Sequence, residues 1–435
     1  MNTRLRRNAL LFVALAASWS SVVAQDRAPT EPRRAAGRFE AVLSRAGGPY
    51  GGDAVDLARE ILDLGNDAVD RSFDALAREI DRGAETSSDS PRLVVLWTVF
   101  DLAGRARWRP VIDRRLDASP GHGVLAASTT ILRDGGTAQD LDLLLRAGQL
   151  DLAGECREEF QAAVTQILSR DANGFGVLEA TIPLDQEHVW PAVVAGVEDT
   201  RRARAAEVLV HWIERHKVLR LACLQHLSRL ALSLPKPFPE DWVTGLRSLL
   251  ERGESDTLPD LLVCLGRLED DASIPLYLRW LKEGEHAVRK NALWALQYTT
   301  RLTFDEDPKA WLVWWRDEST WWEKESVSAF ASLRRGTKAE KVAALNAIDV
   351  RRTGRHRLAA EVAPALRDRD PDVACLAAFQ LGNLGSPVVV DDLIDALGST
   401  TASLERAAHE ALERIARRKL PEDAEAIRSL VGHLP

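Results

Sequence analysis

Few residue pairs in this sequence have types and spacing that suggest catalysis or metal binding. His409 and Glu413 in HEALE are four residues apart, so a helix would place both on one face, as in some zinc sites. The zinc motif HExxH has a second histidine where Glu413 stands, and no third ligand is evident. Solvent-facing positions on a helix are the alternative for both. We therefore expect no metal ligands here.

A glycine pattern, GHGVLA at residues 121–126, matches the spacing of a dinucleotide-binding loop. That loop requires a preceding strand within a βαβ unit. The preceding VIDRRLDASP has a helical pattern instead. We expect no cofactor and no catalytic residues.

Tryptophan is concentrated in residues 311–322, at positions 311, 314, 315, 321 and 322. Sugar platforms, partner hot spots and core packing all use this residue type. Trp311, Trp314 and Trp315 have helical spacing and are expected in the core. Trp321 and Trp322 have no counterpart in another repeat: they are candidates for partner binding, and the alternative is that they seal the extended helix.

Two short basic runs contrast with the acidic average of the chain, RRAR at residues 201–204 and RRTGRHR at residues 351–357. An anionic ligand would suit such runs, and a solvated helix end is the alternative. Arg351, Arg352, Arg355 and Arg357 are therefore our candidate partner-binding residues.

The N-terminal residues 1–24 have the pattern of a cleaved signal peptide. Arg4, Arg6 and Arg7 precede a short apolar run at residues 9–19, and Val22 and Ala24 fit the cleavage rule. The sequence thus predicts export to the periplasm or outside the cell, and no stable membrane insertion after cleavage. An uncleaved anchor is the alternative.

Composition narrows the classes of partner. The chain has 435 residues, 46% apolar and 28% charged, with a net charge of −8. Cleavage removes three arginines and no acid, which takes the charge to −11. Since phosphate backbones require a basic surface, we expect no nucleic-acid partner. The abundance of Ala, Leu, Arg and Glu favours helices.

The sequence resembles itself at an offset of 116 residues. Shared positions follow the three-, four- and seven-residue spacing of a buried helical stripe. Leu265, Gly266, Leu268, Ala292, Ala295 and Leu296 fall on Leu381, Gly382, Leu384, Ala408, Ala411 and Leu412. The same offset places Trp311 on Ile427, Trp314 on Leu430 and Trp315 on Val431, which again predicts core positions. Internal repeats of this kind indicate stacked supersecondary units.

One repeating unit spans residues 369–400 and is expected to form two antiparallel helices. Asp370 or Asp372 would cap the first helix, with Pro371 in its first turn. Gly382 and Gly385 would form the turn, and Pro387 and Gly398 would open and close the second helix.

This unit resembles bacterial HEAT repeats, including those of phycobilisome-lyase-like proteins. The matching residues are Asp370, Asp372, Val373, Ala377, Leu381, Gly382, Leu384, Gly385, Val390, Leu393 and Leu397. The likeness is good over residues 258–431 and weak over residues 54–255. It implies an all-α fold, an α-α superhelix or solenoid of antiparallel helix pairs.

We therefore predict a signal peptide at 1–24, a flexible linker at 25–52, divergent helical repeats at 53–255 and HEAT-like repeats at 256–435. Such solenoids usually bind extended partners, so the expected function is a non-catalytic scaffold for a protein or extended peptide. An enzyme of the lyase-like HEAT type and a glycan-binding module that uses exposed tryptophans remain the alternatives.

Overall fold

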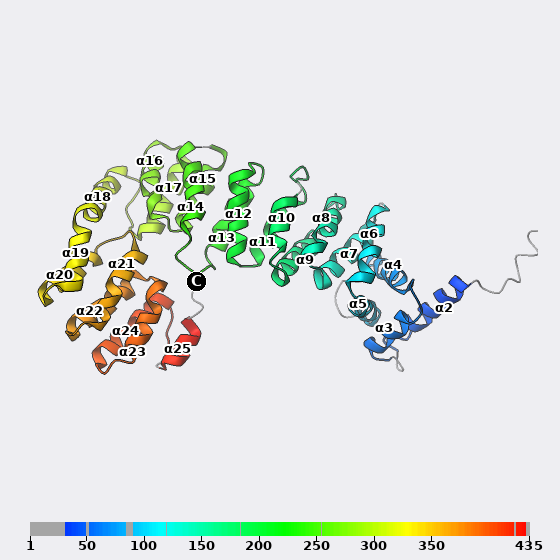
Figure 1. Cartoon of the computed structure of the whole chain (residues 1–435). Helices are drawn as coiled ribbons and strands as arrows, with labels where there is room; N and C mark the ends of the chain where they lie inside the picture. Colours follow the sequence, from blue (N-terminus) through cyan, green and yellow to red (C-terminus); the bar gives the residue numbers. More distant parts are fainter. Residues whose placement is uncertain are drawn as a thin grey trace, which may run out of the picture. The chain divides into compact units, whose positions relative to one another are not determined.

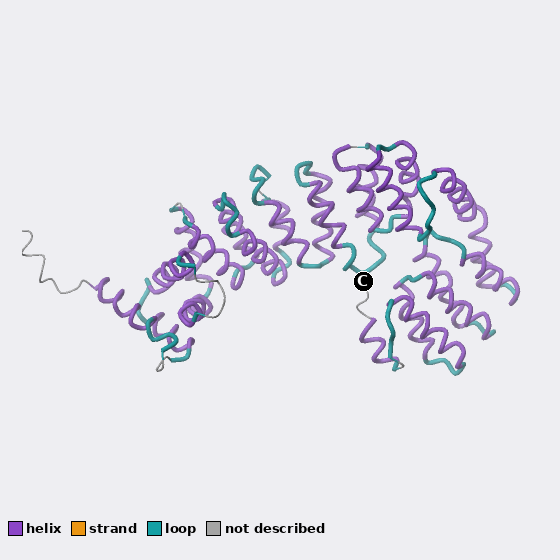
Figure 2. Tube along the Cα trace, turned by 180° about the vertical axis from the view of Figure 1, so that it is seen from behind, coloured by secondary structure: helices purple, strands orange, loops and turns teal. Residues whose placement is uncertain are grey.

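The computed structural model describes residues 31–48, 52–83, 90–118, 120–182, 184–253, 255–421 and 423–431. These residues form helices joined by turns, with no strand among them (Figure 2). The predicted all-α class is confirmed. The predicted signal peptide at residues 1–24 lies outside the described residues.

The chain divides into two compact units, residues 1–174 and residues 175–435. The sequence likeness divides the repeats elsewhere, at residues 255 and 256, and that division stays a prediction. Unit 1 contains α2 (Glu31–Leu43), α3 (Ala54–Leu62), α4 (Ala68–Asp81), α5 (Pro91–Ala103), α6 (Arg105–Asp117), α7 (His122–Gly135), η1 (Ala138–Asp140), α8 (Leu141–Leu150) and α9 (Arg157–Arg170).

Helices of unit 1 pack on their second neighbours along the chain. One row runs α3, α5, α7, α9 and the other α4, α6, α8. A buried carboxylate ties α6 to the start of α8 within the second row: Asp140 is 0% exposed and accepts from Arg105 Nε at 2.7 Å and from Arg109. Each helix thereby covers the apolar face of the next, as a stack of repeats requires.

The first helix of unit 1 corrects a prediction. Residues 25–52 were expected to form a flexible linker, but Glu31–Leu43 form α2. The reason is a short apolar stripe: Phe39, Val42 and Leu43 have helical spacing and are all buried. The charged residues that precede and adjoin this stripe mask it when composition alone is considered.

Unit 2 is built from the remaining helices. They are α10 (Gly174–Thr181), α11 (Trp190–Asp199), α12 (Ala203–Arg215), α13 (Arg220–Leu230), α14 (Glu240–Arg252), η2 (Ser255–Thr257), α15 (Leu258–Arg267), η3 (Asp271–Ser273), α16 (Ile274–Glu283), α17 (His286–Thr300), α18 (Pro308–Thr320), η4 (Trp321–Glu325), α19 (Ser326–Arg335), α20 (Lys338–Asp349), α21 (Arg355–Val362), η5 (Ala363–Arg367), α22 (Pro371–Leu384), η6 (Pro387–Val389), α23 (Val390–Leu397), α24 (Ala402–Ala416) and α25 (Ala424–Val431).

The solenoid pattern is clear in unit 2, where helices follow one another in chain order (Figure 1). Helices α11, α13, α15 and α17 pack in succession in one row, and α20, α22 and α24 pack in succession farther along the chain. Partner helices such as α12 with α14, and α16 with α18, form the other row. The predicted solenoid of antiparallel helix pairs is confirmed.

The unit predicted at residues 369–400 shows how the sequence sets the helix ends. Asp370 caps α22 by accepting from the amide of Asp372, and Pro371 occupies the first turn. Gly385 ends α22 with a left-handed φ of 62°. Gly382, however, lies within α22: a Cβ there would be 2.8 Å from the Ala411 Cα, so glycine permits close approach of α24 rather than forming a turn.

The 116-residue offset identifies equivalent positions correctly in the core. Ala295 and Ala411 are each 0% exposed, and so are Trp311 and Ile427. Trp311 therefore fills a slot that another repeat fills with isoleucine, as predicted. Trp314 and Trp315 are only half-buried, because the helices next to α18 cover less of this face than the core prediction assumed.

A π-helical turn, η4, interrupts the long helical segment that begins at Pro308 and ends at Arg335. One extra residue per turn shifts the direction of the following side chains. Consecutive residues Trp321 and Trp322 consequently both contact Phe330, with ring centroids at 6.1 and 6.3 Å.

Among the residues that the structure describes, no helix combines the length and apolar character that a membrane crossing needs.

Candidate functional site: an arginine-lined hollow in unit 2

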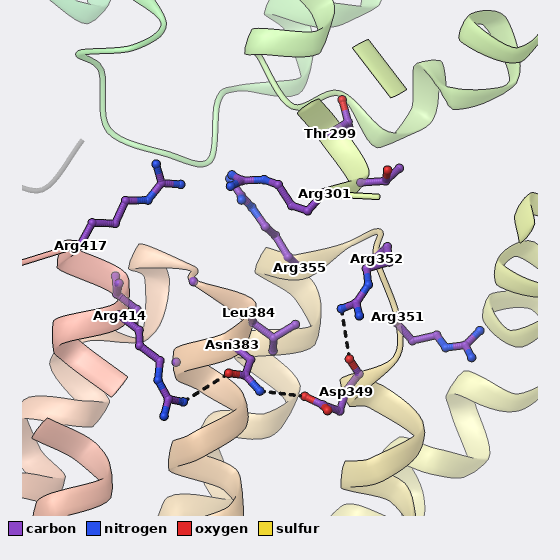
Figure 3. A pocket seen from close by; sticks show the side chains of 14 residues that line it. Thr299, Arg301, Asp349, Arg351, Arg352, Arg355, Asn383, Leu384, Arg414 and Arg417 are labelled. Carbon is purple, nitrogen blue, oxygen red and sulfur yellow. Dashed lines mark hydrogen bonds between the residues drawn. The ribbon is translucent and has the colours of Figure 1, made fainter. Parts of the chain in front are cut away.

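Unit 2 contains a strongly charged hollow of about 230 Å³, called here the arginine hollow. Its lining contains six arginines and one carboxylate, Asp349. The arginines are Arg301, Arg351, Arg352, Arg355, Arg414 and Arg417. They come from the end of α17, the segment between α20 and α21, and the end of α24, so three parts of the solenoid meet here (Figure 3).

Hydrogen bonds on one side of the arginine hollow fix the directions of its side chains. Asn383 donates to Asp349 Oδ1 at 3.1 Å and accepts from Arg414 at 3.2 Å (Figure 3). Arg414 also lies over the Phe379 ring at 4.5 Å. Arg352 donates to the Asp349 carbonyl at 3.3 Å.

Two carboxylates hold the loop at residues 350–354, which carries the candidates Arg351 and Arg352 and leads directly into Arg355. Glu318, 1% exposed, accepts from the amides of Arg352 and Thr353, each at 2.9 Å. Its Oε1 also accepts from the Thr353 hydroxyl at 2.8 Å. Asp271 accepts from the Gly354 amide at 2.6 Å. The loop is thus tied to α18 and to the start of η3.

Trp322 packs against the same loop. Its Nε1 donates to Thr353 Oγ1 at 2.7 Å, and a Cβ at Gly354 would lie 2.5 Å from its ring. Trp321 is 3% exposed and belongs to the core. Both tryptophans were predicted to bind a partner. Instead, Trp321 is a core residue and Trp322 packs against the loop that positions the arginines.

The four predicted partner-binding arginines separate into two groups. Arg351, Arg352 and Arg355 line the arginine hollow, although Arg351 turns toward α18, where it is 3.4 Å from Glu318 and 5.4 Å from the Trp321 ring centroid. Arg357 does not line it. Its guanidinium lies over the Trp322 ring, at 4.9 Å from the centroid.

A second hollow of about 240 Å³, called here the Glu269 hollow, shares Arg301, Arg355 and Arg417 with the first. Glu269, with a 6% exposed side chain, accepts from Lys236 at 2.6 Å and pairs with Arg355. Arg301 is 3.8 Å from the same carboxylate. Unit 2 therefore brings Lys236 and Arg417, 181 residues apart, to one site.

Excess positive charge perturbs these groups. Burial, together with Arg355, Arg301 and Arg417, lowers the pKa of Lys236 to about 8. Burial and Arg417 lower the pKa of Arg355 to about 10. Burial comes first for Arg301 as well, and its pKa is lowered further by Arg417. Like charges are thus held together with too few carboxylates to balance them.

Sequence reasoning missed Lys236, Glu269, Arg301, Arg414 and Arg417. A signal for three of these five was present in the 116-residue offset, which places Glu269 on Gly385 and Arg301 on Arg417. All four have a left-handed φ, between 53° and 62°. This conformation favours glycine, so charged residues there store strain, and such strain is concentrated at functional sites.

A serine, a histidine and a glutamate also meet beside the Glu269 hollow. His356 Nδ1 is 2.8 Å from Ser386 Oγ, and its Nε2 is 3.9 Å from Glu269 Oε2. Burial, Arg355 and Lys236 lower the pKa of His356 to about 4, so the imidazole is neutral at pH 7. Ser386 is 0% exposed, which leaves its hydroxyl out of reach of a substrate.

The other motifs that suggested chemistry take ordinary structural roles. His409 lies 2.9 Å from the Pro421 carbonyl, and Glu413 accepts from Lys419 at 2.8 Å. GHGVLA opens α7, and the preceding segment is α6 rather than a strand. Within the described ranges, no group of three or more His, Cys, Asp or Glu could hold a metal ion.

Fold and site together define an all-helical repeat protein with an arginine-lined hollow. No protein-family model matches the chain, and no curated protein sequence matches it. Among solved structures it is similar to the crystal structure of an engineered protein, at 15% identity over 89% of this chain and 96% of that chain, with a TM-score of 0.28. At that TM-score the class rests on the helix packing of this chain alone.

Proposed function

We propose that this chain is an exported, HEAT-like repeat scaffold that binds an acidic, extended segment of a protein partner and catalyses no reaction. A single observation supports it most: six arginines from three separate parts of unit 2 line one hollow, in a chain whose net charge is −8. Because arginine is costly to collect and desolvate without anions, such a cluster favours an anionic ligand.

The partner chemistry follows from the lining. Guanidinium groups bind carboxylates through paired hydrogen bonds, and acidic side chains along an extended peptide would meet arginines from successive helix pairs. Nucleic acid is less well supported, because the acidic chain as a whole would repel a long phosphate backbone. Export rests on the pattern of residues 1–24, and the HEAT assignment on the repeat at residues 369–400.

The structure supports glycan binding less well than the tryptophan content of the sequence does. A sugar platform needs an exposed indole face, whereas Trp321 is 3% exposed and Trp322 is covered by Arg357. Neither tryptophan offers a free ring for stacking.

An enzyme remains the second candidate, because His356 lies between Ser386 and Glu269 with arginines nearby. The full burial of Ser386 favours a structural role for this group. A fluorophosphonate probe separates the two: labelling of the mature chain that disappears in Ser386→Ala would support a hydrolase and contradict the scaffold. Absence of labelling supports the scaffold.

The scaffold is tested with synthetic peptides and the mature chain from residue 25. A fluorescent, extended peptide rich in Asp and Glu should bind, and its lysine-rich counterpart should not. The double variant Arg352→Ala, Arg414→Ala should weaken binding about tenfold, since two charge-assisted contacts are lost. Arg335→Ala is the matched control, because Arg335 is exposed and does not line the arginine hollow. Equal losses in both variants would contradict the proposal.

A further inference from the structure

Positive charge in the Glu269 hollow exceeds negative charge. Lys236, Arg301, Arg355 and Arg417 all line it, and Glu269 is the carboxylate among its lining residues. Nearby Asp271 accepts a hydrogen bond from the backbone of Gly354. Arg417 has no carboxylate within ion-pair distance among the described residues. Four cations that share one carboxylate are stabilised when a further anion joins them.

The cationic side chains enter the Glu269 hollow from different directions, and these directions decide which shape of anion fits. Lys236 reaches the hollow from the loop after α13, Arg301 and Arg417 from the ends of α17 and α24, and Arg355 from the start of α21. The two Glu269 oxygens already engage Lys236 and Arg355. Donors that arrive from four segments do not share a plane, so they suit a tetrahedral group better than a second planar carboxylate.

Aromatic contacts and the backbone conformation together set the position of the Arg301 side chain. Tyr298 lines the hollow, stacks on Trp294 at 4.9 Å and carries the Arg301 guanidinium over its ring at 5.9 Å. Arg301 and Arg417 keep left-handed φ values of 62° and 53° although glycine would fit both positions without strain. Both arginines are therefore held toward this hollow at a conformational penalty.

We propose that the Glu269 hollow binds one phosphate group, a tetrahedral dianion, through Arg301, Arg355, Arg417 and Lys236. The phosphate is either free or a monoester carried by the partner. A dianion lowers the excess charge more than a carboxylate does, and a phosphate monoester is largely dianionic at pH 7.5 because its second pKa is about 6. The hollow, at about 240 Å³, has several times the ~30 Å³ share of one water molecule.

This inference deepens the proposed function and rests on it for the identity of the partner. Bound phosphate would also raise the pKa values of Lys236 and Arg355, which burial and neighbouring cations now lower.

Calorimetry of the mature chain in an uncharged buffer at pH 7.5 and constant ionic strength tests the proposal. The probes are inorganic phosphate, sulfate as a second tetrahedral dianion, and acetate as a monoanion. We expect one phosphate or sulfate per chain and no acetate binding at the same concentration. Equal binding of acetate and phosphate, or no binding of either, overturns the proposal.

Variants at left-handed positions provide the matched comparison. Arg417→Gly and Arg301→Gly remove a guanidinium while relieving backbone strain, so the chain is expected to fold. Each should weaken phosphate binding at least tenfold, about 1.4 kcal/mol. Arg201→Gly makes the same change at an exposed residue with φ 51° outside the hollow, and should leave affinity unchanged. An equal loss in Arg201→Gly overturns the site.

Methyl phosphate distinguishes the two sources. Binding as tight as that of inorganic phosphate supports a group carried by a partner, and binding of inorganic phosphate alone supports a free anion. Failure of this inference is separable from failure of the proposed function. Acidic-peptide binding that depends on Arg352 and Arg414 without phosphate binding overturns only the phosphate site. Phosphate binding without peptide binding overturns only the peptide scaffold.

Discussion

Arg301 and Arg417 occupy the same place in two repeats 116 residues apart, and both end a helix with a left-handed φ, 62° and 53°. Gly385 occupies the corresponding place after α22, with φ 62°. Glycine and arginine are thus both accommodated at a left-handed helix end, and Arg301, Arg417 and Gly385 all line the arginine hollow and the Glu269 hollow.

Replacing either arginine by glycine should not destabilise the chain. We expect the free energy of unfolding of Arg301→Gly and Arg417→Gly to stay the same or rise by up to about 1 kcal/mol, because backbone strain and like-charge repulsion are both relieved. Urea denaturation measures this. Gly385→Ala should instead lose about 1 kcal/mol. A loss of more than about 1 kcal/mol in the arginine variants would show that these side chains stabilise the fold.

Glu318 should be among the most sensitive residues of unit 2. Glu318→Ala leaves two amides and the Thr353 hydroxyl without their acceptor and Arg351 without a buried partner, so we expect a loss of about 3 kcal/mol in urea denaturation. Its neighbour Asp317 also pairs with Arg351, at 3.2 Å, but is 75% exposed. Asp317→Ala should change stability by less than about 0.5 kcal/mol. Similar losses at both positions would contradict this account of the loop.

Trp322 and Thr353 should be energetically coupled. Trp322→Phe removes the indole donor and Thr353→Val removes its acceptor, and each should be destabilising by about 1 kcal/mol or more. In a double-mutant cycle the coupling energy should be about 1 kcal/mol. Trp314→Phe combined with Thr353→Val serves as the control pair and should be additive. Additivity in the Trp322 cycle would refute the contact.

The pH dependence of stability should contain two opposing parts. Burial, with Asp270 and Glu318, raises the pKa of Asp271 to about 7, so the folded state holds a proton that the unfolded state releases near pH 4. Stability from this group falls as pH rises from about 4 to 7. His356 has a pKa lowered to about 4, so the unfolded state binds the extra proton, and stability from this group rises as pH rises from about 4 to 6.5.

Single variants should separate these parts in denaturation curves at several pH values. The groups around His356 are Arg355, Lys236, Glu269 and Ser386. Asp271→Asn should leave a stability that rises over pH 4 to 6.5. His356→Gln should leave one that falls over pH 4 to 7. Parallel curves for the two variants would refute the assignments.

The repeat pattern of the sequence predicts the fold well because each helix pair is specified locally. Asp370, Pro371 and Gly385 are all placed by short-range rules, and Trp311 by equivalence with Ile427. Gly382 was misplaced because a glycine for close helix contact and a glycine for a turn have the same appearance in sequence. The α2 helix was missed because three apolar residues suffice to dock it.

The candidate site is only partly predictable. Arg351, Arg352 and Arg355 were found because they are adjacent in sequence. Lys236 and Arg417 meet only through the accumulated curvature of unit 2, which no local pattern specifies. The tryptophans were singled out correctly as unusual, but their role depends on the π turn, and hydropathy periodicity assumes a regular helix.

That π turn places a one-residue insertion within a helix, where most repeat proteins would accept an extra residue in a loop. Deleting one residue there would restore α-helical pitch and rotate everything that follows by about 100° relative to what precedes it. Trp322 and the loop at residues 350–354 would then no longer be aligned with Glu318. The arginines that this loop carries would be displaced as well. The direction in which side chains point after the π turn thus determines whether arginines from distant parts of unit 2 can line one hollow.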